Sequence, residues 1–261
     1  MNNFVESHVS IVGAGPGDPE LLTRKAHRLL GNADVVIFDR LVAPEILELA
    51  RPEATFINVG KAPGQIGWTQ DAINKELVSR ATNGAQVVRL KSGDPSLYGR
   101  LEEELEALDE AGIAYDIVPG ITSALSAAAV AKVSLTKRHR NSSVRFITGQ
   151  DIDGFAEHDW EALSQTGNVA VMYMGRSASR FVQRRLLLHG ADRTAPVTLV
   201  ENSSRSDQRI LNTTLHSLVE TIEREALNGP VIMLFGLKSR IANSSELTEY
   251  ETDLFLKAST A

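Results

Sequence analysis

Apolar runs of strand length alternate with helical patterns along this sequence, and that alternation restricts the fold more than any other feature. The clearest unit covers residues 87–104, where an apolar run, Val87–Leu90, meets the turn 91–95 and a charged helical pattern resumes near Arg100. A strand that leads through a turn into a helix is the building block of α/β sheets. Ligands of such sheets bind beyond the carboxyl ends of the strands, so the turn is a candidate site.

The same unit recurs from one end of the chain to the other. In the first half, strands are predicted at 8–12, 33–39, 54–60, 86–90 and 115–120, and helices at 20–30, 44–50, 70–82, 100–111 and 121–131. In the second half, strands are predicted at 144–148, 168–175, 195–202 and 229–236, and helices at 160–164, 177–189 and 215–227. The fold class is therefore α/β.

A polar, basic segment without periodicity, 134–143, separates the two halves and is interpreted as a linker. The prediction is an N-terminal α/β domain at 8–135, a C-terminal α/β domain at 140–240 and a tail at 241–261. Ligand sites often lie between domains, so we expect the site in an interdomain cleft. The loop 61–68 is expected to be exposed, as connecting loops usually are.

Composition removes several functional classes. The chain has 261 residues, no cysteine and a net charge of −6, so disulfides and thiolate chemistry are excluded and a general nucleic-acid partner is disfavoured. Six scattered histidines give no metal-binding spacing, so no catalytic metal is expected. Neither a signal peptide nor a membrane-spanning apolar run is visible, and we expect a cytoplasmic protein without membrane contact.

The first glycine-rich loop, Gly13–Pro19, follows a strand and precedes a helix, as a dinucleotide-binding loop does. Two residues disfavour that interpretation. Pro16 lacks the amide hydrogen that a pyrophosphate needs, and Asp18 stands in place of the third glycine. Asp39 at the end of the strand 33–39 is the acidic residue that a dinucleotide site would require, so an NAD(P)-dependent oxidoreductase stays as an alternative.

Six segments occur in the order found in tetrapyrrole methylases, and the resemblance covers residues 8–240. They are VSIVGAGPGDPELLT, VVRLKSGDPSLYGR, VPGITSA, SLTKR, VMYMG and VENSSRSDQR. The resemblance implies a homodimer of two-domain α/β chains that binds S-adenosylmethionine in the interdomain cleft and releases S-adenosylhomocysteine. The branch it is most similar to methylates uroporphyrinogen III at C2 and C7, giving precorrin-2 for siroheme and cobalamin. SGDPSLYG is closer to the precorrin-4 branch, so methylation of precorrin-4 or another precorrin is the alternative.

The resemblance also implies roles for particular residues. The cofactor contacts fall on Pro16, Ser92, Gly93, Asp94, Leu97, Thr122, Ser123, Met174 and Ser203. Catalytic roles fall on Arg100 and Glu103, and substrate contacts on Arg138 and Met174. Ser92, Leu101 and Glu102 stand where most relatives carry glycine.

Methyl transfer from a sulfonium to carbon needs no metal, and most of the rate should come from orienting the two reactants. A base must later remove a proton, a demanding task for Arg100 because a free guanidinium stays protonated up to about pH 12. Binding a substrate carboxylate is the other role open to it.

The basic residues near 132–145 are expected to meet the substrate's eight carboxylates, or to be a solvated linker. Most of the acidic run 102–110 is expected to be solvated surface. A protein that binds tetrapyrroles without turnover is a third possibility.

Overall fold

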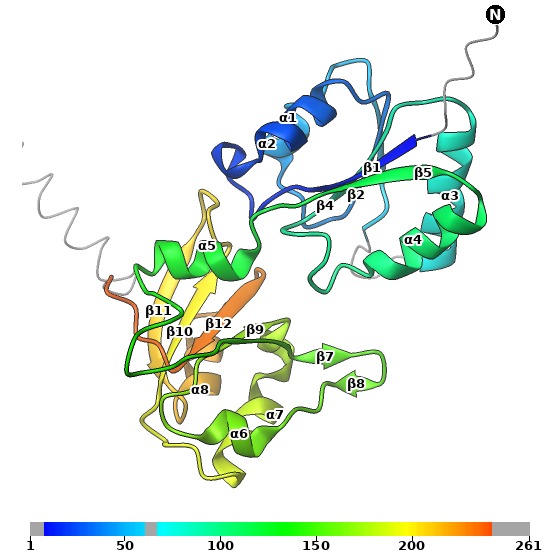
Figure 1. Ribbon diagram of the computed structural model, residues 1–261. Coiled ribbons are helices and arrows are strands. Elements are labelled where there is room, and N and C mark those ends of the chain that lie inside the picture. The colour runs from blue at the N-terminus through cyan, green and yellow to red at the C-terminus, as the bar shows by residue number, and fades with distance from the viewer. Residues whose placement is uncertain (1–7, 61–66, 242–261) are drawn as a thin grey trace, which may run out of the picture. The chain divides into compact units, whose positions relative to one another are not determined.

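The computed structural model describes residues 8–60 and 67–241. The chain divides into two compact units, one ending at Ser123 and the other beginning at Ala124. Most of the predicted loop at 61–68 and nearly all of the predicted tail at 241–261 lie outside the described residues. The mixed α/β class predicted from the sequence is confirmed in both units (Figure 1).

The first unit contains a five-stranded parallel sheet in the order β3-β2-β4-β1-β5. Its strands are β1 (His8–Gly13), β2 (Val35–Phe38), β3 (Thr55–Asn58), β4 (Val87–Lys91) and β5 (Ala114–Val118). Val9 pairs with Val87 on one side and with Tyr115 on the other, so β1 lies inside the sheet. Because all five strands run the same way, their carboxyl ends share one edge.

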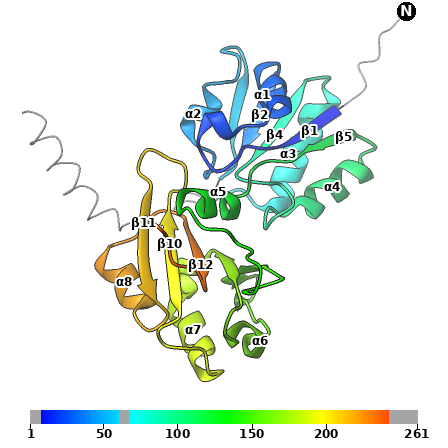
Figure 2. The same cartoon turned by 60° about the vertical axis from the view of Figure 1, so that its left-hand side comes forward.

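Helices cover both faces of this sheet (Figures 1 and 2). They are α1 (Arg24–Gly31), α2 (Pro44–Leu47), α3 (Gln70–Thr82) and α4 (Leu101–Glu110). Alternate side chains of a strand point to opposite faces. Val36 and Leu90 therefore pack in one core with α1 and α2, whereas Ile37 and Val87 pack in another with α3 and α4.

The first helix begins later than predicted. The side chain of Asp18 accepts a hydrogen bond from the Glu20 amide, and residues Pro19–Leu21 form a short 3₁₀ turn. The Thr23 hydroxyl then caps α1 by accepting from the Ala26 amide, 3.2 Å away. Asp18 thus helps to shape the exit from the glycine-rich loop.

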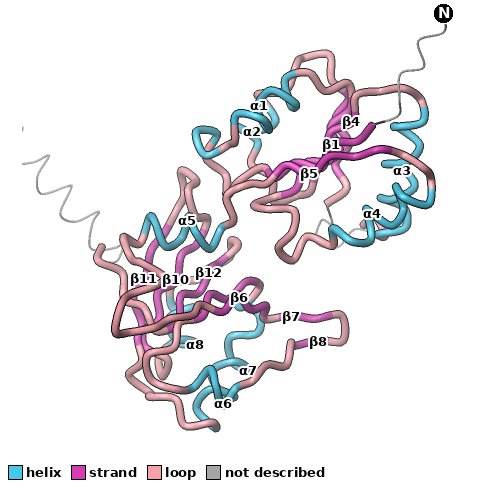
Figure 3. Tube along the Cα trace, in the orientation of Figure 1, coloured by secondary structure: helices cyan, strands magenta, loops and turns pink. Residues whose placement is uncertain are grey.

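The second unit contains a mixed sheet in the order β11-β10-β12-β9-β6 (Figures 1 and 3). Its strands are β6 (Arg145–Thr148), β9 (Ala170–Tyr173), β10 (Pro196–Glu201), β11 (Arg209–Thr214) and β12 (Val231–Phe235). Only β6 and β9 pair in parallel; the other neighbours are antiparallel. Since β12 runs opposite to both β9 and β10, the carboxyl ends of β6, β9 and β10 share one edge. Strand β11 was not predicted from the sequence.

Up to residue 241, where the description ends, four helices and a small hairpin complete this unit. The helices are α5 (Ser123–Val130), α6 (Trp160–Ser164), α7 (Gly175–Leu188) and α8 (Leu218–Arg224). The hairpin joins β7 (Gln150–Asp151) to β8 (Gly154–Phe155), where the sequence predicted a loop. Side chains of α6, α7 and α8 share one core with the sheet, and those of α5 share the other.

The segment 134–143 lies within the second unit, whereas the sequence placed the domain boundary there. Helix α5 is the reason, because Ala124, Ala127 and Ala131 are fully buried in the same core as strands β9, β10 and β12. Arg140 and Asn141 also hold the segment in place. The Arg140 guanidinium donates to the Ser134 carbonyl at 2.7 Å, and the Asn141 amide donates to the Leu135 carbonyl at 2.9 Å.

Candidate cofactor and substrate site

Three loops of the first unit meet at the carboxyl ends of β1, β4 and β5. The Ala14 amide donates to the Lys91 carbonyl at 2.8 Å. Gly15 and Gly93 exchange backbone hydrogen bonds of 3.1 and 2.8 Å, which joins the first glycine-rich loop to the turn after β4. These bonds fix the loops against each other at the edge where α/β proteins bind ligands.

Glycine is required where the loops touch. A Cβ atom on Gly120 would lie 2.1 Å from the Gly93 carbonyl oxygen, and one on Gly13 would lie 2.5 Å from the Gly120 amide nitrogen. Gly93 itself has a φ of +70°, a left-handed conformation that glycine adopts without strain. The backbones approach so closely that side chains at these positions are sterically excluded.

The Asp94 carboxylate ties the β4 loop to the β5 loop. Its Oδ2 accepts a hydrogen bond from the Gly120 amide at 3.0 Å. Its Oδ1 accepts from the amide and the hydroxyl of Ser96. Asp94 is therefore engaged within the protein, and any bond to a ligand would use a remaining lone pair.

The other predicted cofactor residues of the first unit lie in the same loops. Pro16 is buried directly after Gly15, and the Leu97 amide donates to the Asp94 carbonyl at 3.3 Å. Thr122 is buried, while Ser92 and Ser123 are half-buried. A Cβ on Gly93 would lie 3.8 Å from both the Thr122 Cα and the Ser123 amide nitrogen. The structure thus brings the loops that carry all seven of these residues together.

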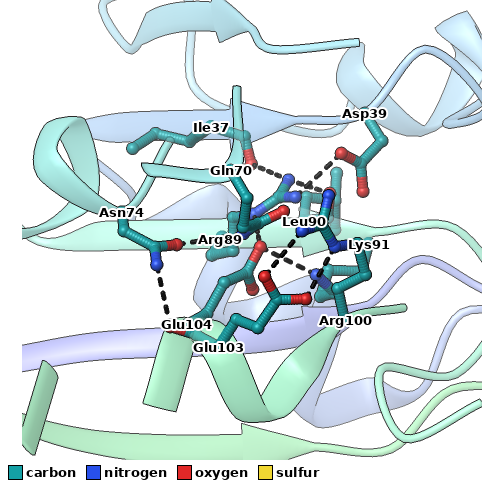
Figure 4. A network of polar contacts seen from close by, with 10 residues as sticks. All are labelled: Ile37, Asp39, Gln70, Asn74, Arg89, Leu90, Lys91, Arg100, Glu103 and Glu104. Atoms are coloured by element: carbon teal, nitrogen blue, oxygen red, sulfur yellow. Dashed lines mark hydrogen bonds and ion pairs between the residues drawn. The ribbon is translucent and has the colours of Figure 1, made fainter. Parts of the chain in front are cut away.

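Arg100 and Glu103 form a two-point ion pair at the start of α4 (Figure 4). The Arg100 Nε lies 2.7 Å from one carboxylate oxygen of Glu103, and Nη2 lies 2.6 Å from the other. The hydrogen bond from Arg100 lowers the pKa of Glu103, and the same bond raises the pKa of Arg100. With its pKa raised, Arg100 is held more firmly in the charged form, which cannot accept a proton, so this geometry favours a binding guanidinium.

In the second unit, Met174 directly follows β9 and Ser203 lies shortly after β10, two strands whose carboxyl ends share an edge. Met174 caps α7 after β9, and its side chain is 46% exposed. Ser203 lies two residues beyond β10 and is buried, with its hydroxyl 2.8 Å from that of Ser126 on α5. Arg138 is exposed in the turn 134–143.

Arg100 and Met174 share an unusual backbone conformation. Each precedes a helix with a left-handed φ, +54° for Arg100 and +51° for Met174, and neither side chain makes a capping hydrogen bond. Residues other than glycine rarely adopt this conformation, and it concentrates at functional sites.

Glu104 is the exception to the prediction of a mostly solvated acidic run. The acidic run was predicted to be mostly solvated, as Glu102, Glu106, Asp109 and Glu110 are, but Glu104 is 0% exposed. It accepts hydrogen bonds from Arg89 and Lys91, and Arg89 also binds Asp39 at 2.8 Å (Figure 4). Two cations at alternate positions of an apolar strand were the signal, because such cations require a buried acid.

Across 8–60 and 67–241, no three histidine or acidic residues are grouped as metal ligands would be. Over the same ranges, no helix has the length and apolar character that crossing a membrane requires.

These features define an α/β protein of two units, and in the first of them glycine-bearing loops gather at strand ends, where α/β proteins bind small molecules. Residues 8–219 match the family of tetrapyrrole (corrin/porphyrin) methylases, and the chain belongs to that family. The family predicted from the six sequence segments is thereby confirmed.

Curated relatives of this chain include siroheme synthases. A siroheme synthase of Nitrosomonas europaea is 42% identical over 235 residues, 90% of this chain and 50% of the relative. A siroheme synthase 2 of Aeromonas hydrophila is 44% identical over 238 residues, again 90% of this chain and 50% of the relative. The chain thus spans about half the length of the curated relatives it matches.

Solved structures agree with the fold. A cobalt precorrin-4 methyltransferase superposes with a TM-score of 0.79 at 26% identity, covering 88% of this chain and 95% of that one. The uroporphyrin-III C-methyltransferase of Thermus thermophilus, complexed with S-adenosylhomocysteine, gives 0.75 at 33% identity, covering 88% and 92%.

Proposed function

We propose that this chain transfers methyl groups from S-adenosylmethionine to C2 and C7 of uroporphyrinogen III, giving precorrin-2. The observation that carries the proposal is the similarity to the Thermus thermophilus uroporphyrin-III C-methyltransferase, which was solved with S-adenosylhomocysteine and is matched over 92% of its length. The curated siroheme synthases, more than 40% identical to this chain, point to the same branch.

The cofactor is proposed to lie along the joined loops of the first unit. Their backbones approach closely at Gly13, Gly93 and Gly120, which leaves amides and small side chains to meet a polar ligand. Pro16, Ser92, Gly93, Asp94, Leu97, Thr122 and Ser123 are the proposed contacts there. Met174 and Ser203 are the proposed contacts from the second unit.

The substrate is a polycarboxylate, so cationic side chains should bind it. We propose Arg100 and Arg138 for this role, because both are exposed and both carry a permanent positive charge. Glu103 would hold the Arg100 guanidinium in a fixed orientation through their two hydrogen bonds. The proton that leaves the methylated macrocycle needs another acceptor, since the pKa of Arg100 is raised.

An anaerobic incubation with uroporphyrinogen III and S-adenosylmethionine tests the proposal. The expected product is heavier by two methyl groups, with two equivalents of S-adenosylhomocysteine formed. A parallel incubation with precorrin-4 addresses the precorrin-4 alternative. If only precorrin-4 is methylated, it replaces uroporphyrinogen III as the proposed substrate. If neither incubation releases S-adenosylhomocysteine, methyl transfer is refuted.

The homodimer that the family resemblance implies is part of the same proposal. Light scattering on the purified protein should give twice the mass of one chain, and a single-chain mass at assay concentrations would contradict it.

A further inference from the structure

A buried ion pair lies beneath the loop that carries the proposed cofactor residues. Lys91 is the last residue of β4, Glu104 lies in the first turn of α4, and the Lys91 Nζ is 2.8 Å from the Glu104 Oε1. The side chains are 3% and 0% exposed. We call this pair the tether, because it joins the two ends of the loop 92–100.

The same carboxylate oxygen also accepts from the Arg89 Nε at 2.9 Å. Arg89 continues to the Asp39 carboxylate and donates to the carbonyls of Ile37 and Leu90 (Figure 4). The Glu104 Oε2 is buried and accepts no hydrogen bond from the described residues. Two cations therefore converge on one oxygen of Glu104, and its second oxygen has no hydrogen-bond donor among the described residues.

Stability alone is a weak reason for this arrangement. Around it, the core between the sheet and helices α3 and α4 is apolar, with Ile11, Val87 and Leu77 among its buried residues. Removing charges from water is unfavourable, and apolar residues often replace a buried ion pair without loss of stability. A retained ion pair in such a place is better explained by the geometry that it imposes.

The tether imposes geometry on the loop at both ends. At its start, the Lys91 carbonyl accepts from the Ala14 amide, so the strand end is fixed to the first glycine-rich loop. Near its end, Gly99 packs on the Lys91 side chain, since a Cβ there would lie 3.0 Å from the Lys91 Cε and 2.7 Å from the Pro95 carbonyl oxygen. The helix that follows holds Glu104, and the Asn74 amide donates to the Glu103 carbonyl at 2.8 Å.

We propose that Glu104 is a positioning residue: through Lys91 it holds the loop 92–100 in the conformation that binds cofactor. The identity of the cofactor rests on the proposed function, whereas the effect of Glu104 on the loop conformation does not. It separates two roles within three adjacent acidic residues. Glu104 holds the loop from below, whereas Glu103 orients Arg100 at the surface.

A double variant tests the tether apart from stability. Glu104→Gln alone leaves two buried cations without their shared acid, so it should unfold easily. Lys91→Met with Glu104→Gln removes one charge of each sign and keeps Arg89 paired with Asp39. We expect its thermal midpoint to recover most of the loss, while calorimetric affinity for S-adenosylhomocysteine stays about tenfold weaker, roughly 1.4 kcal/mol. KM for S-adenosylmethionine should rise similarly, and kcat at saturation should change less.

Asp34→Asn is the matched control, since Asp34 binds Arg51 and the Gln86 amide in the same unit, at the opposite edge of the sheet. It should lower the thermal midpoint and leave cofactor affinity unchanged. Recovery of affinity together with stability in the double variant would overturn the tether role.

Hydrogen exchange separates failure of the tether from failure of the proposed function. The Gly93 and Leu97 amides are hydrogen-bonded within the loops and should exchange faster in the double variant than in the wild type or in Asp34→Asn. Unchanged exchange would refute the tether. A wild-type chain that binds no S-adenosylhomocysteine would refute the proposed function alone.

Discussion

The Asp94 carboxylate accepts a hydrogen bond from the Gly120 amide at 3.0 Å and so joins two loops that are 26 residues apart in the sequence. The same carboxylate closes a local turn through Ser96. One side chain thus shapes the turn after β4 and fixes it to the turn after β5. The relationship explains why a short acidic residue follows the glycine at this strand end.

Asp94→Ala should weaken the protein and its cofactor site together. It leaves the Gly120 amide without its acceptor, which should lower the free energy of unfolding by about 1–3 kcal/mol. Affinity for S-adenosylhomocysteine should fall roughly tenfold in calorimetry. Asp192→Ala is the control, because Asp192 makes the same turn with Thr194 in the second unit. Equal cofactor affinity in wild type and Asp94→Ala would refute the role of Asp94.

Gly120→Ala should be strongly destabilising, because the new methyl group would lie 2.1 Å from the Gly93 carbonyl oxygen. Overpacking of this kind lowers the free energy of unfolding by about 1–3 kcal/mol, which chemical denaturation would measure. Gly31→Ala, at the end of α1, provides the comparison, since its methyl group would lie 3.8 Å from the Leu49 carbonyl oxygen. That variant should be unchanged or more stable by up to about 1 kcal/mol.

Arg100→Ala should reduce methyl transfer and spare cofactor binding. Loss of a charged hydrogen bond to a substrate carboxylate should lower kcat/KM roughly ten- to hundredfold. Arg180→Ala is suited as a control, because Arg180 also forms an exposed ion pair, with Glu223 on α8. A variant that no longer binds S-adenosylhomocysteine would show that Arg100 belongs to the cofactor site instead.

The ion pair with Arg100 should be detectable as a lowered pKa of the Glu103 carboxyl group. Because the pKa of Glu103 is lowered in the folded chain, the pair stabilises the fold above the unfolded pKa and loses that effect as pH falls through the folded pKa. Both groups are about half exposed, so the effect on stability is small. Carboxyl NMR should place the Glu103 midpoint below the ordinary value of about 4.3. Arg100→Ala should raise that midpoint; an unchanged midpoint would exclude the pairing in solution.

Much of the first unit could be predicted from the sequence because its elements are strongly patterned. Strand β2 is a continuous apolar run, β1 and β4 are mostly apolar, and Gly13, Gly93 and Gly120 lie at or just beyond the ends of β1, β4 and β5. Strand β11 was missed because its residues Arg209–Thr214 include one short apolar pair among polar residues. The hairpin β7–β8 was missed because two-residue strands have no period to detect.

The contacts inside the site were less predictable, since they join distant residues. Glu104 resembles its exposed neighbours in sequence, and its burial depends on Arg89 and Lys91, 15 and 13 residues away. Ser203 was predicted as a cofactor contact from the family resemblance, but its pairing with Ser126 across 77 residues leaves no local pattern. Periodicity describes one element at a time, whereas these contacts depend on how elements pack.

The left-handed backbone at Arg100 and Met174 lowers the stability of the fold at two positions whose side chains are proposed to serve activity. A non-glycine residue in this conformation costs about 1–2 kcal/mol, which a glycine at either position would recover. The same substitution would remove a side chain proposed to meet substrate or cofactor. Selection of this chain for heat resistance alone should therefore enrich glycine at positions 100 and 174. The selected proteins should be harder to unfold and should transfer methyl groups more slowly.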